Sequence, residues 1–143
     1  MDGALTKLIK SGYGIEEDYN CTEKIVRGAN VAYGLNLPEE ALRMMGGFGG
    51  GMGQGETCGV VTGAVAVLSS LLVQERAHAT PELKPATQLF IQRFQETLDD
   101  MDCRELRPKY RTPEHGCDYI ITIGAQLLDE LIDELNIQSK KTS

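Results

Sequence analysis

The sequence contains four cysteines but no Cys-x-x-Cys pair, and it lacks several other motifs that would assign a function directly. Without a Cys-x-x-Cys pair, a thioredoxin-type dithiol and an ordinary zinc ribbon are both disfavoured. There is no Gly-x-x-x-x-Gly-Lys-Ser/Thr phosphate loop and no oxygen-ligand spacing of the EF-hand type, which argues against nucleotide and calcium sites. The cysteines themselves therefore become the main chemical clue.

The chain also lacks an excess of basic residues. Its lysines and arginines number 14 against 21 aspartates and glutamates, a formal net charge of −7, so we expect neither nucleic acid nor an anionic membrane as a partner. No basic stretch followed by an apolar core marks a secretory signal near Met1. The uncharged run from Thr57 to Gln74 is diluted by glycine, threonine and serine, so a buried helix is favoured over a membrane span. We therefore expect a cytoplasmic protein without membrane insertion.

Convincing strands are absent too, because apolar residues recur at helical spacing along most of the chain. Asn20 is a plausible N-cap for a helix from Cys21, and Gly34 is a natural stop for it. The segment from about 57 to 77 is apolar nearly all round, which places it at the centre of a bundle. We predict one all-α domain over residues 1–143, a bundle of five to six helices around this buried central helix.

Two segments are expected to be irregular. The stretch from Cys103 to Pro113 contains two prolines and is predicted to be a connector between helices. Residues 140–143 are predicted to form a frayed tail.

Cys58 lies where a glycine-rich loop, residues 46–55, meets the predicted central helix. A thiol at a helix N-terminus gains thiolate character from free N–H groups and from the helix dipole. We therefore expect Cys58 to carry the most reactive thiolate, with Cys21 or Cys117 as its partner. Cys21 and Cys117 also fall at or just before predicted helix starts, whereas Cys103 falls at a helix end or in a connector.

The residues leave three interpretations of Cys21, Cys58, Cys103 and Cys117 open. Two or more thiols could converge for thiol–disulfide exchange or electron transfer. The four thiolates could instead bind zinc or an iron–sulfur cluster, or the cysteines could be small core residues. His115 is a candidate to activate a thiol or bind a metal, although a solvated loop histidine is the simpler interpretation.

One early cysteine, a glycine-rich approach to Cys58-Gly59-Val60-Val61-Thr62-Gly63, and two later cysteines at 103 and 117 together resemble the C-GCAxxG-C-C family. The resemblance covers about Cys21 to Cys117. The second cysteine of that family lies in a Cys-Gly-Ala-x-x-Gly motif. Here Val60 stands where the motif has alanine, which adds bulk beside the thiol but removes no chemical group.

This family consists of small bacterial and archaeal proteins that are classed as redox-active on account of their cysteines, and its genes often lie near transporter genes. The resemblance therefore implies that Cys21, Cys58, Cys103 and Cys117 form the active set. It also implies a redox or transporter-linked protein partner. An accessory protein for a transporter, in which the cysteines only stabilise the bundle, remains the non-catalytic alternative.

Overall fold

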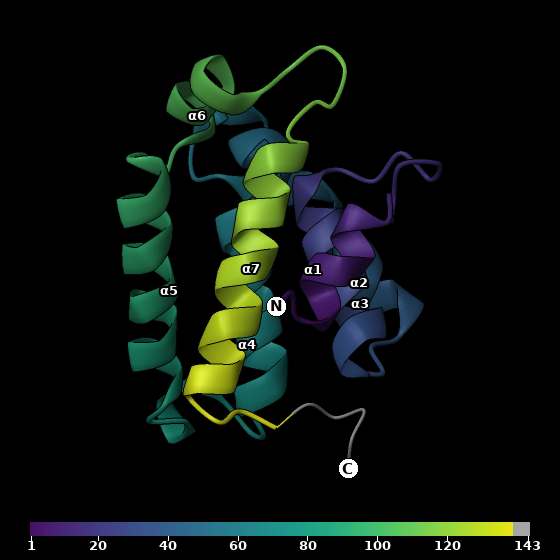
Figure 1. The fold of residues 1–143 in the computed structure, drawn as a ribbon. Helices are drawn as coiled ribbons and strands as arrows, with labels where there is room; N and C mark the ends of the chain where they lie inside the picture. Colours follow the sequence, from purple (N-terminus) through teal and green to yellow (C-terminus); the bar gives the residue numbers. More distant parts are fainter. Residues whose placement is uncertain (139–143) are drawn as a thin grey trace.

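The computed structural model describes residues 1–138, and these form a bundle of seven α-helices (Figure 1). The described residues contain no β-strand, only two isolated β-bridges. The predicted all-α fold is confirmed, with at least one helix more than expected, while the predicted tail at 140–143 lies outside the described residues. The α-helices are α1 (Ala4–Lys10), α2 (Cys21–Tyr33), α3 (Glu39–Arg43), α4 (Gly59–Leu72), α5 (Leu83–Leu98), α6 (Cys103–Tyr110) and α7 (Asp118–Glu134).

Helix α4 is the buried central helix that the sequence predicts. It packs against α2, α5 and α7, and in Figure 1 it lies behind α7. It is shorter than the predicted range of 57–77, because Cys58 is its N-cap and the backbone becomes extended at Val73. Among the described residues, no helix combines the length and apolar composition needed to cross a membrane. The buried residues of α4 are Gly59, Val60, Val61, Gly63, Ala64, Val67 and Leu68.

Local sequence signals set both ends of α2. The Asn20 side chain accepts a hydrogen bond from the Glu23 backbone N–H (3.0 Å), and the Glu23 carboxylate accepts one from the Asn20 N–H (2.9 Å). This reciprocal pair is a capping box, which satisfies N–H groups that the helix itself leaves free. Gly34 ends the helix in the left-handed conformation, as predicted. The capping box makes Cys21 the first residue of the helix.

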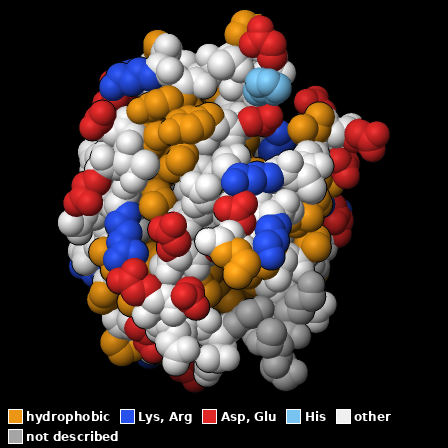
Figure 2. Space-filling view, in the orientation of Figure 1, with side chains coloured by type: hydrophobic (Ala, Val, Ile, Leu, Met, Phe, Trp, Pro, Cys, Tyr) orange, Lys and Arg blue, Asp and Glu red, His pale blue; other side chains and the backbone are white. Residues whose placement is uncertain are grey.

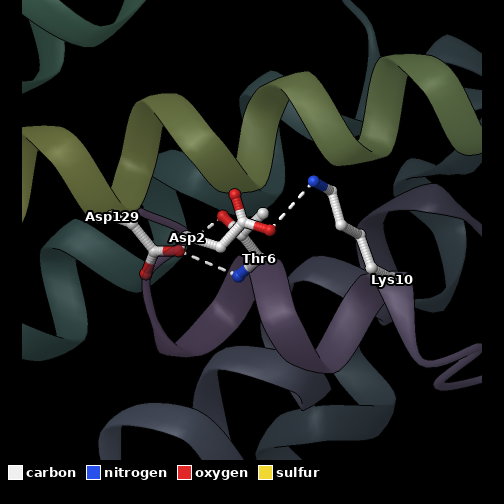
Figure 3. A network of polar contacts seen from close by, with 4 residues as sticks. All are labelled: Asp2, Thr6, Lys10 and Asp129. Atoms are coloured by element: carbon white, nitrogen blue, oxygen red, sulfur yellow. Dashed lines mark hydrogen bonds and ion pairs between the residues drawn. The ribbon is translucent and has the colours of Figure 1, made fainter.

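Helix α1 receives its N-terminal cap from another helix. The carboxylate of Asp129, on α7, accepts hydrogen bonds from the backbone N–H groups of Leu5 (3.2 Å) and Thr6 (2.8 Å). It also accepts hydrogen bonds from the hydroxyls of Thr6 (2.6 Å) and Tyr33 (2.5 Å). Figure 3 shows Asp129 reaching from α7 to Thr6 at the start of α1. One carboxylate thus ties α1, α2 and α7 together at a fixed register.

The predicted irregular connector from Cys103 to Pro113 is wrong over most of its length, because Cys103–Tyr110 forms α6. This helix buries Cys103 and Leu106. Pro108 lies in its last turn, where an eight-residue helix loses only the one hydrogen bond that a proline nitrogen cannot donate. The proline-containing composition of this segment does not indicate a helix, because the helix is stabilised by tertiary packing.

Candidate functional site

All four cysteines lie at the N-terminal ends of α-helices. Cys21 and Cys103 are the first residues of α2 and α6, and Cys58 and Cys117 are the N-cap residues of α4 and α7. The sequence predicts this position for three of them. It places Cys103 incorrectly, because α6 is not recognised from the sequence.

The four cysteines line one pocket with a volume of about 310 Å³. The pocket lies at the end of the bundle where α7 begins and α6 crosses, which is the upper end in Figure 1. Tertiary packing thus brings together all four predicted site residues from distant parts of the chain. The charged residues and histidine that also line the pocket are Asp18, Lys24, Arg107, Arg111, His115 and Asp118.

The four thiols are free and differ in their access to solvent. No disulfide joins them. Cys58 and Cys103 are buried, with exposed fractions of 5% and 7%, whereas Cys21 and Cys117 are partly exposed. Within residues 1–138, no three cysteine, histidine, aspartate or glutamate side chains are placed so that they could hold one metal ion. In this geometry the pocket therefore offers two accessible and two buried thiols, and the residues do not fit a formed zinc or iron–sulfur site.

Backbone hydrogen bonds hold Cys58 beside Cys103. An isolated antiparallel bridge joins the segments that lead into α4 and α6. Across it, the Cys58 N–H donates to the Met101 carbonyl (2.8 Å), and the Cys103 N–H donates to the Glu56 carbonyl (2.7 Å). Because side chains alternate between the two faces of such a pair, Cys58 and Cys103 project from the same face.

A close approach of α2 and α4 places the Cys21 sulfur next to the residue that follows Cys58. A side chain at Gly59 would collide with the Cys21 Sγ. One turn further along α4, a side chain at Gly63 would lie 3.2 Å from Ile25. The two glycines allow the backbones of α2 and α4 to approach, because neither carries a side chain that would separate the helices.

The glycine-rich loop before Cys58 winds in a left-handed turn. Gly50, Gly51, Met52 and Gly53 have consecutive φ angles of 65°, 62°, 60° and 67°, a conformation that residues other than glycine disfavour. A side chain at Gly51 would also collide with the backbone of Glu56. The glycines are therefore needed to bend the chain tightly just before the cysteine pocket.

Burial dominates the pKa of Cys58. The sequence predicts that the N-terminus of α4 favours the thiolate. In the structure, loss of solvent raises the pKa of Cys58 to about 12, and the backbone N–H groups of Val60 and Val61 lower it only in part. The neighbouring thiols of Cys21 and Cys103 raise the pKa further. Cys58 is therefore protonated at neutral pH in this conformation.

Burial and nearby charged groups have opposing effects on the pKa of Cys117. Burial raises its pKa first, and the nearby Cys21 adds to that effect, whereas the guanidinium groups of Arg111 and Arg107 lower it. These two arginines are pocket residues that the sequence analysis missed. Arg107 lies in α6 and Arg111 is its C-cap residue, so both fall in the segment that the sequence predicts as a connector, where no local signal marks them as pocket residues.

His115 lines the pocket, yet it is exposed, and its backbone N–H donates to the Thr112 hydroxyl (3.0 Å). This agrees with a solvated loop histidine. Lys24 makes an ion pair with Asp118 (3.4 Å) at the pocket wall.

Residues 19–131, well over half of the chain, match the family described as "Putative redox-active protein (C_GCAxxG_C_C)". The chain belongs to the C-GCAxxG-C-C family. Comparison with curated proteins and with solved structures gives no match.

The Cys-Gly-Ala-x-x-Gly motif of the C-GCAxxG-C-C family has a direct structural interpretation in this chain. Its two glycines, Gly59 and Gly63, are the positions where α4 approaches α2. Val60 replaces the motif's alanine and faces α7, where a side chain at Gly124 would collide with the Val60 Cγ1. A glycine on α7 thus accommodates the larger residue on α4.

Proposed function

We propose that the protein carries out two-electron thiol–disulfide exchange in the pocket lined by its four cysteines. The observation that supports this most strongly is the convergence of four free thiols, at four helix N-termini, on one pocket of about 310 Å³. A dithiol mechanism needs one accessible thiol and a second thiol close to it. The pocket contains both, since Cys21 and Cys117 are partly exposed and Cys58 and Cys103 are buried in the same pocket.

Cys21 is the attacking thiol in this proposal. It is partly exposed and is the first residue of the capped helix α2. The sequence alone favours Cys58 for this role, but Cys58 is 5% exposed and burial holds its pKa at about 12. Cys58 takes the second step in this proposal, because a thiol that lies beside the Cys21 sulfur can resolve a mixed disulfide formed there.

The exchange then proceeds in two balanced steps. The Cys21 thiolate attacks a substrate disulfide R–S–S–R, forms a Cys21–S–S–R mixed disulfide and releases one RS⁻. Cys58 gives its proton to that released thiolate and attacks the Cys21 Sγ, which forms a Cys21–Cys58 disulfide and releases the second thiolate. The substrate is reduced by two electrons and the protein is oxidised by two, so an external dithiol or pair of thiols must restore Cys21 and Cys58.

Such a cycle needs a reducing compartment, in line with the predicted cytoplasmic location. The external reductant would be the redox or transporter-linked protein partner that the resemblance implies.

Thiol counting on protein purified without oxygen tests the proposal, together with metal analysis. We expect no stoichiometric zinc or iron, four titratable thiols, and reversible loss of two of them in a glutathione redox buffer. Cys21→Ser and Cys58→Ser should abolish the reversible loss. Cys103→Ser and Cys117→Ser are matched controls, because they make the same change in the same pocket and should retain it.

Two results would overturn the proposal. Stoichiometric zinc or iron with shielded thiols would make the pocket a metal site. Four thiols that never oxidise in pairs would favour the accessory protein in which the cysteines only stabilise the bundle.

A further inference from the structure

Two arginines at the cysteine pocket have no acidic partner. Arg107 and Arg111 lie four residues apart at the end of α6, both are exposed, and both line the pocket. Among residues 1–138, seven ion pairs are formed, and neither arginine belongs to any of them. Their neighbour Arg104, in contrast, is paired with Glu56 (2.6 Å). Arg107 and Arg111 are therefore available to a negatively charged ligand.

Both guanidinium groups act on the interior of the pocket. Each of them favours the charged form of the Cys117 thiol, so their fields reach a sulfur at the pocket wall. A side chain at Gly50 would lie 3.0 Å from an Arg107 Nη atom. The glycine loop thus leaves room for the Arg107 guanidinium to lie against the same pocket that the four cysteines line.

The local charge contrasts with that of the whole protein. The chain has a formal net charge of −7, and Figure 2 shows acidic and basic side chains intermixed over one face of the molecule. At the pocket, Lys24 and Asp118 form an ion pair with each other. The charged pocket residues outside this ion pair are Arg107 and Arg111, which are positive, and Asp18, which is negative. A positive site of this kind on an acidic protein selects anions.

The size of the pocket favours a small molecule. Its volume of about 310 Å³ is near the lower end of the ~300–1,000 Å³ range of small-molecule sites. Guanidinium groups bind carboxylates through two parallel hydrogen bonds, which orients the ligand as well as attracting it.

We infer that the cysteine pocket takes a small disulfide that carries carboxylate groups, and that Arg107 and Arg111 bind a carboxylate while Cys21 faces the disulfide bond. This inference rests on the proposed thiol–disulfide function. The balanced exchange is the one given above, with R bearing the carboxylate.

Three disulfides of similar size and different charge test the inference. The reduced protein is mixed without oxygen with dithiodiglycolate, which has two carboxylates, with neutral hydroxyethyl disulfide, or with cystamine, which has two ammonium groups. Loss of protein thiols is followed over time. We expect the rate with dithiodiglycolate, relative to hydroxyethyl disulfide, to fall about tenfold in an Arg107→Gln/Arg111→Gln variant. The Arg107→Lys/Arg111→Lys variant should recover part of the preference, because it retains the charge but not the paired hydrogen bonds.

An Arg43→Gln variant is the control for loss of a positive charge outside the pocket, since Arg43 is an exposed arginine on α3 that does not line the pocket. It should keep the preference of the unmodified protein. If the rate ratio is the same in the unmodified protein and in the Arg107→Gln/Arg111→Gln variant, the inference is overturned while thiol–disulfide exchange stands. If none of the three disulfides oxidises the protein, both are overturned.

Discussion

The Cys21 sulfur occupies the space that any side chain at Gly59 would need. The same side chain would also collide with the Thr22 hydroxyl, which donates a hydrogen bond to the Gly59 carbonyl (2.9 Å). The glycine that follows Cys58 in the motif is therefore a packing requirement of the pocket. It fixes how closely the first turn of α2 can approach the start of α4.

A Gly59→Ala substitution should separate α2 from α4 at the pocket. We expect the free energy of unfolding to fall by about 2 kcal/mol, because the added methyl group overpacks a buried contact. Oxidation of the Cys21–Cys58 pair should slow as well. Gly47→Ala is the matched control, since a side chain there meets nothing within 4 Å, and its effect should stay within about 0.5 kcal/mol. Equal stability of the two variants in urea unfolding would refute the packing role of Gly59.

Val60 and Gly124 should be energetically coupled. Val60→Ala removes buried methyl groups and should cost about 2 kcal/mol, and Gly124→Ala should cost about 1–3 kcal/mol through overpacking against Val60. The double variant should lose less stability than the sum of the two single losses, by at least ~1 kcal/mol, because alanine at 60 vacates the space that alanine at 124 needs. Urea unfolding of the four proteins gives this coupling directly. Losses that add to within about 0.3–0.5 kcal/mol would show that the two positions are independent.

The helices with strong local signals could be predicted from the sequence, and α6 could not. Asn20 and Gly34 define α2 by their own chemistry, and the apolar run identifies α4 as central. In α6, Pro108 and a mostly charged sequence obscure the two positions that pack inward, Cys103 and Leu106. The stability of α6 comes from those long-range contacts, which no local pattern reveals.

The candidate site was predictable residue by residue but not as a geometry. Helix starts could be read at Cys21, Cys58 and Cys117, yet their meeting at one pocket depends on how the helices pack. The burial of Cys58 could not be predicted for the same reason. The helix terminus is a local feature, whereas the burial that raises the Cys58 pKa is a property of the whole fold.

The reactivity of the four thiols should follow their exposure. At pH 7 a thiol with a pKa of about 12 has about 1,000-fold less thiolate than one at the reference value of 9.0. Iodoacetamide should modify Cys21 well before Cys58 in the folded, reduced protein, because Cys21 is partly exposed whereas Cys58 is buried and protonated. Mass spectrometry of peptides at successive times gives the order, and unfolded protein, in which the rates should converge, is the control. Faster modification of Cys58 than of Cys21 would instead support Cys58 as the attacking thiol.

Stability should fall in alkaline solution because of Cys58. Its pKa is raised on folding from 9.0 to about 12, so its contribution is fully present below pH 9 and is lost as the pH rises from 9 to 12. The loss should be about 1.4 kcal/mol per pH unit over that range. A Cys58→Ala variant should show a shallower fall in urea unfolding under reducing conditions. Burial raises the pKa of Tyr33 and Cys117 too, so some alkaline loss should remain in the variant. Parallel pH curves for the two proteins would exclude Cys58 as the source.

The location of the first disulfide to form tests most directly whether Cys21 and Cys58 are the pair that exchanges with a substrate disulfide. Reduced protein is oxidised with one equivalent of dithiodiglycolate without oxygen, its remaining thiols are alkylated, and its peptides are mapped by mass spectrometry. We expect a Cys21–Cys58 disulfide with Cys103 and Cys117 alkylated. A first disulfide between Cys103 and Cys117, or four alkylated cysteines, would contradict it.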